Sequence, residues 1–370
     1  MSLASRIRLL MTTDTVGGVW TYSCALATNL AGSGVDVTLV TMGPRAHPEQ
    51  RAILKGSPVR LMETDLALEW QDPEGRDIDE ARRVLAAVEA RVRPNIIHLN
   101  SFREATFLWH APTIVVAHSC VNSWALACRD TAWLSEPRWT RYTERVATAL
   151  DRTQVWVTPS QSFHDDITDI YRPHTPGVVI WNGIVSRALG GRKRDQILAA
   201  GRLWDRGKNI ETLTSAAPGL QWPVRVAGAG GANMPNSVEW LGQISHDDLR
   251  ARLQRAAIFV SSALYEPFGL SVLEAAAAGC ALVLSDIPTF RELWSGAAVF
   301  FDPQDSQALH QILDGLCADT AARVRLQGAA YEHSLSYALA RTTEAYLNLY
   351  KDLLQSRRTN APAMPIEVRA

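Results

Sequence analysis

The feature that most constrains this chain is an alternation of short β-rich runs with segments of helical length. Such an alternation is typical of parallel βαβ units, in which each helix carries the chain back to begin the next strand. The sequence therefore predicts an α/β protein built on parallel sheets. The β-rich runs lie at 6–13, 35–42, 94–101, 113–119, 154–160, 177–183, 197–203, 223–229, 238–243, 257–263, 281–286 and 298–303.

The alternation pauses once, in the polar and basic stretch that follows Asn182. The chain has 370 residues, and single hydrophobic cores stop growing near about 250–300 residues. We therefore expect two doubly wound Rossmann-like domains, at 1–183 and 184–336. Apolar residues at three- and four-residue spacing predict a closing helix at 337–356, and the aperiodic segment 357–370 is expected to fray.

Composition excludes several classes of protein. The 37 Lys and Arg residues nearly cancel the 38 Asp and Glu residues, so no whole-protein field attracts nucleic acid or an anionic membrane. Five cysteines without a C-x-x-C pair suggest neither a disulfide framework nor a zinc site. Apolar stretches stay well short of the roughly 20 residues of a membrane span, and the N-terminus lacks the apolar core of a signal peptide. We expect a cytoplasmic protein.

The predicted architecture also locates the site. Two consecutive doubly wound domains can place the carboxyl ends of their strands face to face, and ligands of such sheets bind in the crevice outside those ends. The active site is therefore expected between the two domains, and the loops that follow the strands are the segments in which to look for its chemistry.

The first such loop, at 12–20, carries Gly17 and Gly18 directly before a predicted helix. Two glycines let backbone N–H groups approach a ligand closely at a helix N-terminus, where phosphate is favoured. A bare tight turn is the alternative interpretation.

The second loop, at 201–209, nearly matches a Walker A motif, but its spacing is one residue too long and Asn209 stands where Ser or Thr would bind magnesium. What remains is a strand end with Arg202 and Lys208, two cations able to converge on one phosphate-bearing ligand. A solvated pair of surface cations is the alternative.

The third loop, at 261–274, holds Glu266 in the turn and Glu274 in the first turns of the next helix. Both carboxylates can face the strand edge. Ser271 and Glu274 also fit a capping box, which would explain Glu274 without any function.

This third loop resembles the Glu-x7-Glu motif of the family-four, or group 1, retaining glycosyltransferases. Other segments are similar to that family in the same order: the Gly17–Gly18 loop, VVAHS, VTPSQSF, VIWNGI, AGRLWDRGKN, RVAGAGG and VEWLGQIS. The resemblance covers most of the chain. It implies the two-domain glycosyltransferase B fold, and transfer from a nucleotide sugar with retained anomeric configuration, without a metal ion or other cofactor.

The resemblance also assigns residues. Arg202 and Lys208 would contact the donor diphosphate, where cations stabilise the departing negative charge. Glu266 would bind hydroxyls of the donor sugar, and Glu274 those of the ribose. His118 matches a histidine that approaches the transferred sugar. The remaining positions expected around the donor are Gly17, Gly18, Gly228, Gly230, Leu241, Gly242, Gln243, Phe268, Gly269 and Leu270.

Two positions depart from the family pattern. Ser186 replaces the usual acidic residue after the Asn-Gly-Val type of turn. The spacing from Arg202 to Lys208 is one residue longer than in many relatives, which puts the reach of Lys208 in question.

The partners follow less closely from the sequence. The donor could be a UDP-, GDP- or ADP-sugar, and the acceptor a glycan, a lipid or a small molecule. The segment 136–152 places basic and aromatic side chains on one predicted helix, which would suit a sugar or a phospholipid headgroup and a weak contact with the inner face of the membrane; a solvated amphipathic helix is the alternative. They are Arg138, Trp139, Arg141, Tyr142 and Arg145.

Three rival functions stay open at this stage. A non-hydrolysing sugar-nucleotide epimerase would share the fold and the nucleotide site, and a non-catalytic nucleotide-sugar binding protein would share both as well. A dinucleotide-dependent dehydrogenase would need G-x-G-x-x-G, and the nearest match, GAGGAN at 228–233, lacks the last glycine.

Overall fold

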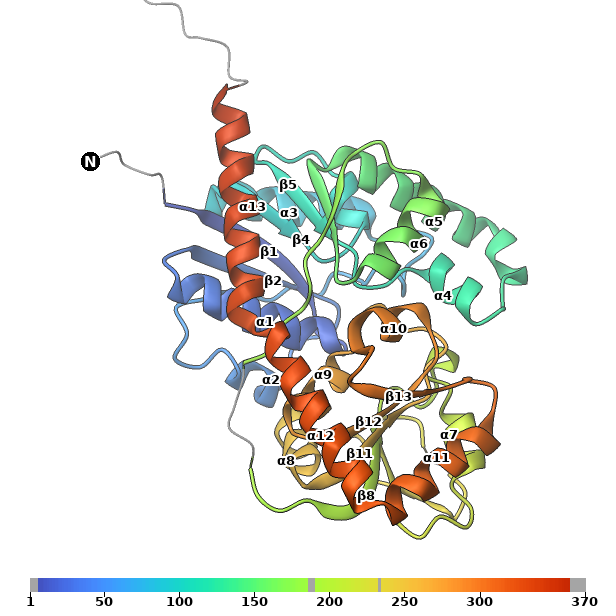
Figure 1. Ribbon diagram of the computed structural model, residues 1–370. Coiled ribbons are helices and arrows are strands. Elements are labelled where there is room, and N and C mark those ends of the chain that lie inside the picture. The colour runs from blue at the N-terminus through green and yellow to red at the C-terminus, as the bar shows by residue number, and fades with distance from the viewer. Residues whose placement is uncertain (1–5, 186–189, 232–233, 360–370) are drawn as a thin grey trace, which may run out of the picture.

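The computed structural model describes residues 6–185, 190–231 and 234–359 and shows two parallel sheets, each in its own domain (Figure 1). The predicted fold is confirmed: all twelve β-rich runs form strands at the expected positions. The sequence missed one strand of three residues at the edge of the first sheet, Arg60–Met62. Ser186 lies outside the described residues.

The N-terminal domain contains a seven-stranded sheet in the order β3-β2-β1-β4-β5-β6-β7. Its strands are β1 (Arg8–Asp14), β2 (Asp36–Met42), β3 (Arg60–Met62), β4 (Ile96–Leu99), β5 (Thr113–Val116), β6 (Val155–Thr158) and β7 (Gly177–Val179). Helices α3, α5 and α6 pack in the core on one face, and α1 covers the other. The helices of this half are α1 (Gly18–Gly32), α2 (Pro48–Ala52), α3 (Ile78–Val92), α4 (Val121–Ala127), α5 (Pro137–Arg152) and α6 (Gln161–Tyr171).

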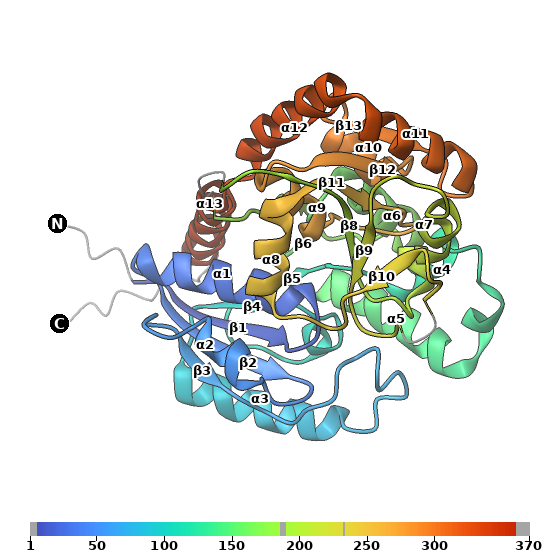
Figure 2. The same ribbon diagram turned by 90° about the horizontal axis from the view of Figure 1, so that it is seen from below.

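The C-terminal domain contains a six-stranded sheet in the order β10-β9-β8-β11-β12-β13. Figure 2 shows α11 and α12 at the outer side of this domain, away from α2 and α3. Its strands are β8 (Arg194–Ala200), β9 (Val224–Ala227), β10 (Val238–Trp240), β11 (Ala256–Ser261), β12 (Ala281–Ser285) and β13 (Ala298–Phe301). Its helices are α7 (Ile210–Ala216), α8 (His246–Arg255), α9 (Leu270–Ala277), α10 (Pro288–Trp294), α11 (Ser306–Ala318) and α12 (Thr320–Ser334).

The strand order reverses once in each sheet, between β1 and β4 and between β8 and β11. Doubly wound sheets bind ligands at this switch point, outside the carboxyl ends of the strands. The loops after β1 and β4 in the first sheet, and after β8 and β11 in the second, are therefore the ones that the topology favours as a site.

The last helix, α13 (Leu339–Thr359), returns to the N-terminal domain and lies along it (Figure 1). The hydroxyls of Tyr346 and Tyr22 are 2.7 Å apart, and the Tyr350 hydroxyl lies 2.7 Å from Nδ1 of His98. Helix α13 begins two residues later than the predicted helix at 337–356 and ends three residues later. The start of the tail that was expected to fray is therefore helical, as far as Thr359. Residues 360–370 lie outside the description, and the domain boundary at 183/184 stays a prediction.

The chain crosses between the two domains twice, and the two crossings lie side by side. The N–H of Ile184 donates to the Tyr337 carbonyl (3.1 Å), and the N–H of Leu339 donates to the Ile184 carbonyl (2.9 Å). A Cβ on Gly183 would lie 2.6 Å from Oγ1 of Thr342, so a larger residue would push the two segments apart.

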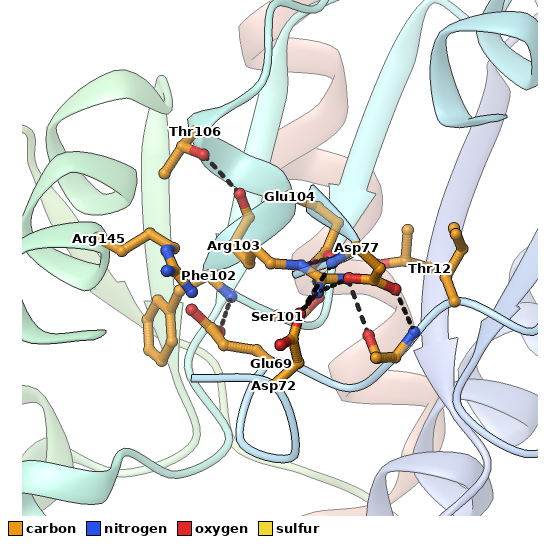
Figure 3. Close-up of polar contacts among 12 residues, drawn as sticks. Thr12, Glu69, Asp72, Asp77, Ser101, Phe102, Arg103, Glu104, Thr106 and Arg145 are labelled. Atoms are coloured by element: carbon orange, nitrogen blue, oxygen red, sulfur yellow. Dashed lines mark hydrogen bonds and ion pairs between the residues drawn. The ribbon is translucent and has the colours of Figure 1, made fainter. Parts of the chain in front are cut away.

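A buried group of charges fixes the loops at the carboxyl edge of the N-terminal sheet (Figure 3). The fully buried Arg103 guanidinium donates to Glu104 Oε1 (2.8 Å), to Asp77 Oδ1 (2.6 Å) and to the Ala67 carbonyl (2.8 Å). Asp72 Oδ2 lies 3.7 Å from the same guanidinium, and Glu69 accepts from the Phe102 N–H at 3.1 Å. We call Glu69, Asp72, Asp77, Arg103 and Glu104 the Arg103 cluster.

Candidate functional site

The Gly17–Gly18 loop of the N-terminal domain faces the start of α9 in the C-terminal domain. Gly17 has φ +80° and precedes the first residue of α1, so this turn requires a glycine. A Cβ on Gly18 would lie 3.5 Å from Cδ1 of Leu270, which is ordinary contact. The first and third predicted loops are thus brought together across the two domains.

Arg202 and Lys208 follow β8, at the switch point of the second sheet. The Lys208 ammonium lies 2.6 Å from Oε2 of Glu266, and these side chains are only 20% and 15% exposed. The extra residue in the loop therefore does not prevent Lys208 from reaching the carboxylate that the sequence singled out. Arg202 is instead paired with Asp205, at 2.7 Å.

Glu274 lies on α9 and contacts a residue that the sequence analysis did not single out. Its Oε1 is 2.6 Å from Nε2 of His246, and this hydrogen bond raises the pKa of His246. The capping-box interpretation is wrong: α9 begins after Gly269, which has φ +88° and no capping side chain, so Ser271 is already inside the helix. The carboxylate of Glu274 is thus held by the His246 ring rather than by the helix end.

His118 follows β5, and a hydrogen-bond network determines which nitrogen carries its proton. The amide nitrogen of Asn100 donates to the Thr12 carbonyl (2.7 Å), so its Oδ1 is directed at Nε2 of His118, 2.7 Å away. Nε2 of His118 is therefore the N–H donor, assigned from this network. Burial lowers the pKa of His118 to about 3, so the ring is neutral and Nδ1 keeps its lone pair.

The glycines predicted to line the nucleoside, Gly228, Gly230 and Gly242, lie together beside the end of β8. Gly228 has φ +148°, and a Cβ there would lie 1.7 Å from the Gly201 carbonyl oxygen, so only glycine fits. Its N–H donates to the Gly242 carbonyl (2.9 Å). Gly230 has φ +95° and lies against Trp204, while Gln243 is exposed.

Phe268 is 4% exposed and packs edge-on against Tyr337, which indicates a role in the core of the loop rather than a free contact surface. The Pro267 carbonyl before it accepts a hydrogen bond from the Ser160 hydroxyl of the N-terminal domain, at 2.6 Å. The backbone of the Glu266 loop is thus anchored to both domains.

Asp14, at the end of β1, is a candidate that the sequence analysis missed. Burial raises the pKa of Asp14 to about 7, and the positive charge of Arg202 in the other domain acts in the opposite sense. The signal available in the sequence was a carboxylate at the last position of the first strand, three residues before the glycine pair.

Helix α5 forms where the basic and aromatic segment predicted it, but its side chains are partly committed to the fold. Tyr142 is 3% exposed, and Arg145 donates to the Pro73 carbonyl at 3.3 Å. Arg138 pairs with Glu136 at 2.8 Å and lies over the ring of Trp139. An acceptor site on this helix stays a prediction.

The described residues contain neither a metal-binding cluster nor a membrane-spanning helix. Among residues 6–185, 190–231 and 234–359, no group of three or more His, Cys, Asp or Glu side chains is arranged to hold a metal ion. Within the same part of the chain, no helix combines the length and the apolar character that a membrane crossing requires.

Two family patterns together account for most of the chain. The family described as Glycosyltransferase Family 4 matches residues 16–186, and the family described as Glycosyl transferases group 1 matches residues 188–333. The chain belongs to the group 1, family-four glycosyltransferases. The resemblance noted from the Glu266–Glu274 loop is thereby confirmed, and so is the glycosyltransferase B fold.

Individual glycosyltransferases resemble the chain over nearly its full length. Glycogen synthase of Mycobacterium tuberculosis is 26% identical over 398 residues, which covers 95% of each chain. Sucrose-phosphate synthase from Thermosynechococcus elongatus superposes with a TM-score of 0.77 at 18% identity, covering 95% of this chain and 100% of that one. HepE of Anabaena, solved in complex with UDP and glucose, has a TM-score of 0.70 at 14% identity, covering 94% and 100%. At these identities the solved structures show a shared fold.

Proposed function

We propose that this glycosyltransferase moves a hexose from a nucleotide-diphosphate sugar to a hydroxyl acceptor, with retention of the anomeric configuration and without a metal ion. The observation that carries the proposal is the Lys208–Glu266 pair, which lies at the switch point of the second sheet where Arg202 also follows β8, opposite the Gly17–Gly18 loop. The solved complexes of HepE with UDP and with UDP-glucose support a nucleotide-sugar donor on this fold.

The charges favour chemistry on a diphosphate leaving group. Cleavage of a sugar–phosphate bond leaves negative charge on the nucleotide, and preorganised cations directed at that charge are commonly the largest catalytic contribution. Among the described residues, Lys208 and Arg202 each form one ion pair with a carboxylate, and both cations are partly exposed, so phosphate oxygens of a donor can reach them. Two protein cations can thus supply the charge that a metal ion supplies elsewhere.

The remaining roles follow the same geometry. Glu266, next to Lys208, would bind sugar hydroxyls close to the diphosphate, and Glu274, held by His246, would bind the ribose. The Nδ1 lone pair of neutral His118 would accept a hydrogen bond from a hydroxyl of the transferred sugar. Asp14, on the N-terminal side, would meet the acceptor.

The test is a transfer assay with matched donors and acceptors. UDP-, GDP- and ADP-glucose and GDP-mannose are each incubated with maltooligosaccharides, with sugar phosphates and with phospholipid vesicles, and the released nucleoside diphosphate is measured. We expect acceptor-dependent release from one nucleotide class. Product from donor alone, with the sugar epimerised, would assign the protein to the epimerases instead, and binding of a donor without turnover would indicate a non-catalytic protein.

The metal independence is tested separately in the productive pair. Turnover is expected to persist in EDTA at an undiminished rate, because Arg202 and Lys208 supply the positive charge. Loss of turnover in EDTA that is restored by Mg²⁺ or Mn²⁺ would overturn this part of the proposal.

A further inference from the structure

One buried carboxylate joins the N-terminal domain to the candidate diphosphate-binding arginine. The indole N–H of Trp124, on α4, donates to Oδ1 of Asp205 at 2.9 Å. The other oxygen of the same carboxylate, Oδ2, accepts from the Arg202 guanidinium at 2.7 Å. The Asp205 side chain is only 6% exposed, so solvent competes little for either bond.

The ionised state of Asp205 suits this linking position. Burial opposes its ionisation, but the hydrogen bond from Trp124 and the charge of Arg202 outweigh that cost and hold the pKa of this carboxyl below its usual range. Its Oδ1 also accepts from the backbone N–H of Gly207 at 2.9 Å, which fixes the carboxylate within its own loop. Oδ2 of Asp205 therefore faces Arg202, while Oδ1 accepts both from its own loop and from Trp124 of the N-terminal domain.

Trp124 owes its position to the N-terminal domain. Its ring lies 6.2 Å from that of Trp133, which is 5.1 Å from Trp139, and Trp139 in turn contacts the buried Tyr142 at 6.0 Å. This aromatic column begins in the core under α5 and ends at Trp124. The loop of the C-terminal domain approaches it through Gly207, where a Cβ would lie 2.7 Å from the indole nitrogen.

The Arg202 guanidinium needs a partner that fixes its orientation. Its side chain is 47% exposed, and a long exposed arginine has many accessible rotamers. Within the described residues, the guanidinium makes one ion pair, through Nη2, and lies over the ring of Trp204, so its other N–H groups can bind phosphate oxygens. A carboxylate that holds Nη2 thereby sets the direction in which those N–H groups point.

We propose that Trp124 is a positioning residue for sugar transfer, which reinforces the orientation of Arg202 through Asp205 when the two domains are together. The inference rests on the proposed function, because it needs Arg202 to bind the departing diphosphate. It adds a way for the N-terminal domain to act on the charge of the donor side: the Arg202–Asp205 pair forms within the C-terminal loop, and Trp124 supplies the one further hydrogen bond to Asp205 that comes from the other domain.

The decisive experiment is a double-mutant cycle measured with the productive donor and acceptor. Trp124→Phe keeps a ring in the aromatic column and removes the N–H donor. We expect kcat to fall about tenfold or more, which is the cost of losing one hydrogen bond to a charged group, while the affinity for the nucleoside diphosphate changes less than twofold. In an Arg202→Ala background, the same Trp124→Phe change should alter kcat less than twofold, because nothing is left to orient.

Two matched variants keep the test independent of folding. Trp70→Phe replaces a half-exposed tryptophan of the N-terminal domain that lies outside the aromatic column, and is expected to keep kcat within twofold of wild type. Asp205→Asn keeps an oxygen for the indole but places an amide N–H against the guanidinium, so it should reproduce the loss of kcat with the Trp124 contact intact. Thermal melts of all variants exclude an effect through unfolding.

The outcomes separate the two proposals. Losses of Trp124→Phe and Arg202→Ala that multiply in the double variant would show that Trp124 acts independently of Arg202, and would overturn the inference alone. Normal kcat in both Trp124→Phe and Asp205→Asn would do the same. If the wild-type protein transfers no sugar from any nucleotide donor, the proposed function itself fails.

Discussion

The Arg103 cluster and the ion pairs of the candidate site use the same residue types for opposite purposes. In the N-terminal domain, Arg103 is fully buried and its three donating nitrogens are occupied by protein oxygens. In the C-terminal domain, Lys208 and Arg202 are partly exposed, and each has a single carboxylate partner. A cation that is fully buried and bonded through all three nitrogens is out of reach of a ligand and holds loops in place, whereas a partly exposed cation can bind one.

The largest effect is expected from removing the buried cation. Arg103→Leu leaves the buried carboxylate of Glu104 and the partly buried one of Asp77 without their cationic partner, and breaking a buried pair costs about 3–5 kcal/mol. Urea denaturation followed by tryptophan fluorescence measures the loss. Arg83→Ala, which removes an exposed pair with Glu80 in the same domain, should cost no more than about 1 kcal/mol. Equal losses of unfolding free energy in Arg103→Leu and Arg83→Ala would show that the buried and the exposed ion pairs contribute alike to stability, contrary to this comparison.

At Lys208 we expect a large loss of activity and a small loss of stability. Lys208→Ala should lower kcat/KM by roughly 10²–10³, the cost of removing one well-placed electrostatic group, while the free energy of unfolding falls far less than in Arg103→Leu. Steady-state kinetics and thermal melts measure the two quantities. Arg206→Ala is the control, because Arg206 is an exposed cation in the same loop, paired with Asp130. Turnover within about twofold of wild type in Lys208→Ala would move the diphosphate role to another cation.

A smaller and pH-dependent effect is expected at Glu69. Burial, with a contribution from the charge of Glu104, raises the pKa of Glu69 to about 7, whereas the unfolded chain loses this proton near 4.5. Between these values the native state binds more protons, so the free energy of unfolding falls as pH rises, by up to about 3 kcal/mol. Glu69→Gln should remove that slope.

The measurement is urea denaturation of both proteins at pH 5 and pH 8. Glu69→Gln should gain stability relative to wild type on going from the lower to the higher pH, and Glu80→Gln, at an exposed position, should not. Parallel curves for Glu69→Gln and wild type would mean that the Arg103 cluster accommodates the charge of Glu69 at no cost.

The fold was readable from the sequence because its signal is periodic and local. Each predicted strand is a run of apolar residues that recurs between helices, and only β3, three residues long at the edge of the sheet, was too short to stand out. The loops that carry the candidate site were readable for a related reason: the topology places strand ends at one edge, so Arg202, Lys208 and Glu266 were expected there.

The partners of the charged residues could not be predicted in this way. Lys208 and Glu266 are 58 positions apart and Trp124 and Asp205 are 81 apart, and nothing in the local pattern reports which side chains meet. The same holds for His246, whose contact with Glu274 replaced the capping box suggested by spacing alone. Long-range pairing depends on how two domains and several loops pack, which one sequence does not encode in any short window.

The side-by-side passage of the chain at Ile184 and Leu339 bears on how the two domains can move. A single linker would let one domain rotate relative to the other about any axis. Two segments joined by backbone hydrogen bonds act as a hinge with one axis. Rotation about other axes would break those hydrogen bonds, whereas bending about the axis along the paired segments would not. With one axis available, Trp124 meets Asp205 in the same register each time the molecule shuts.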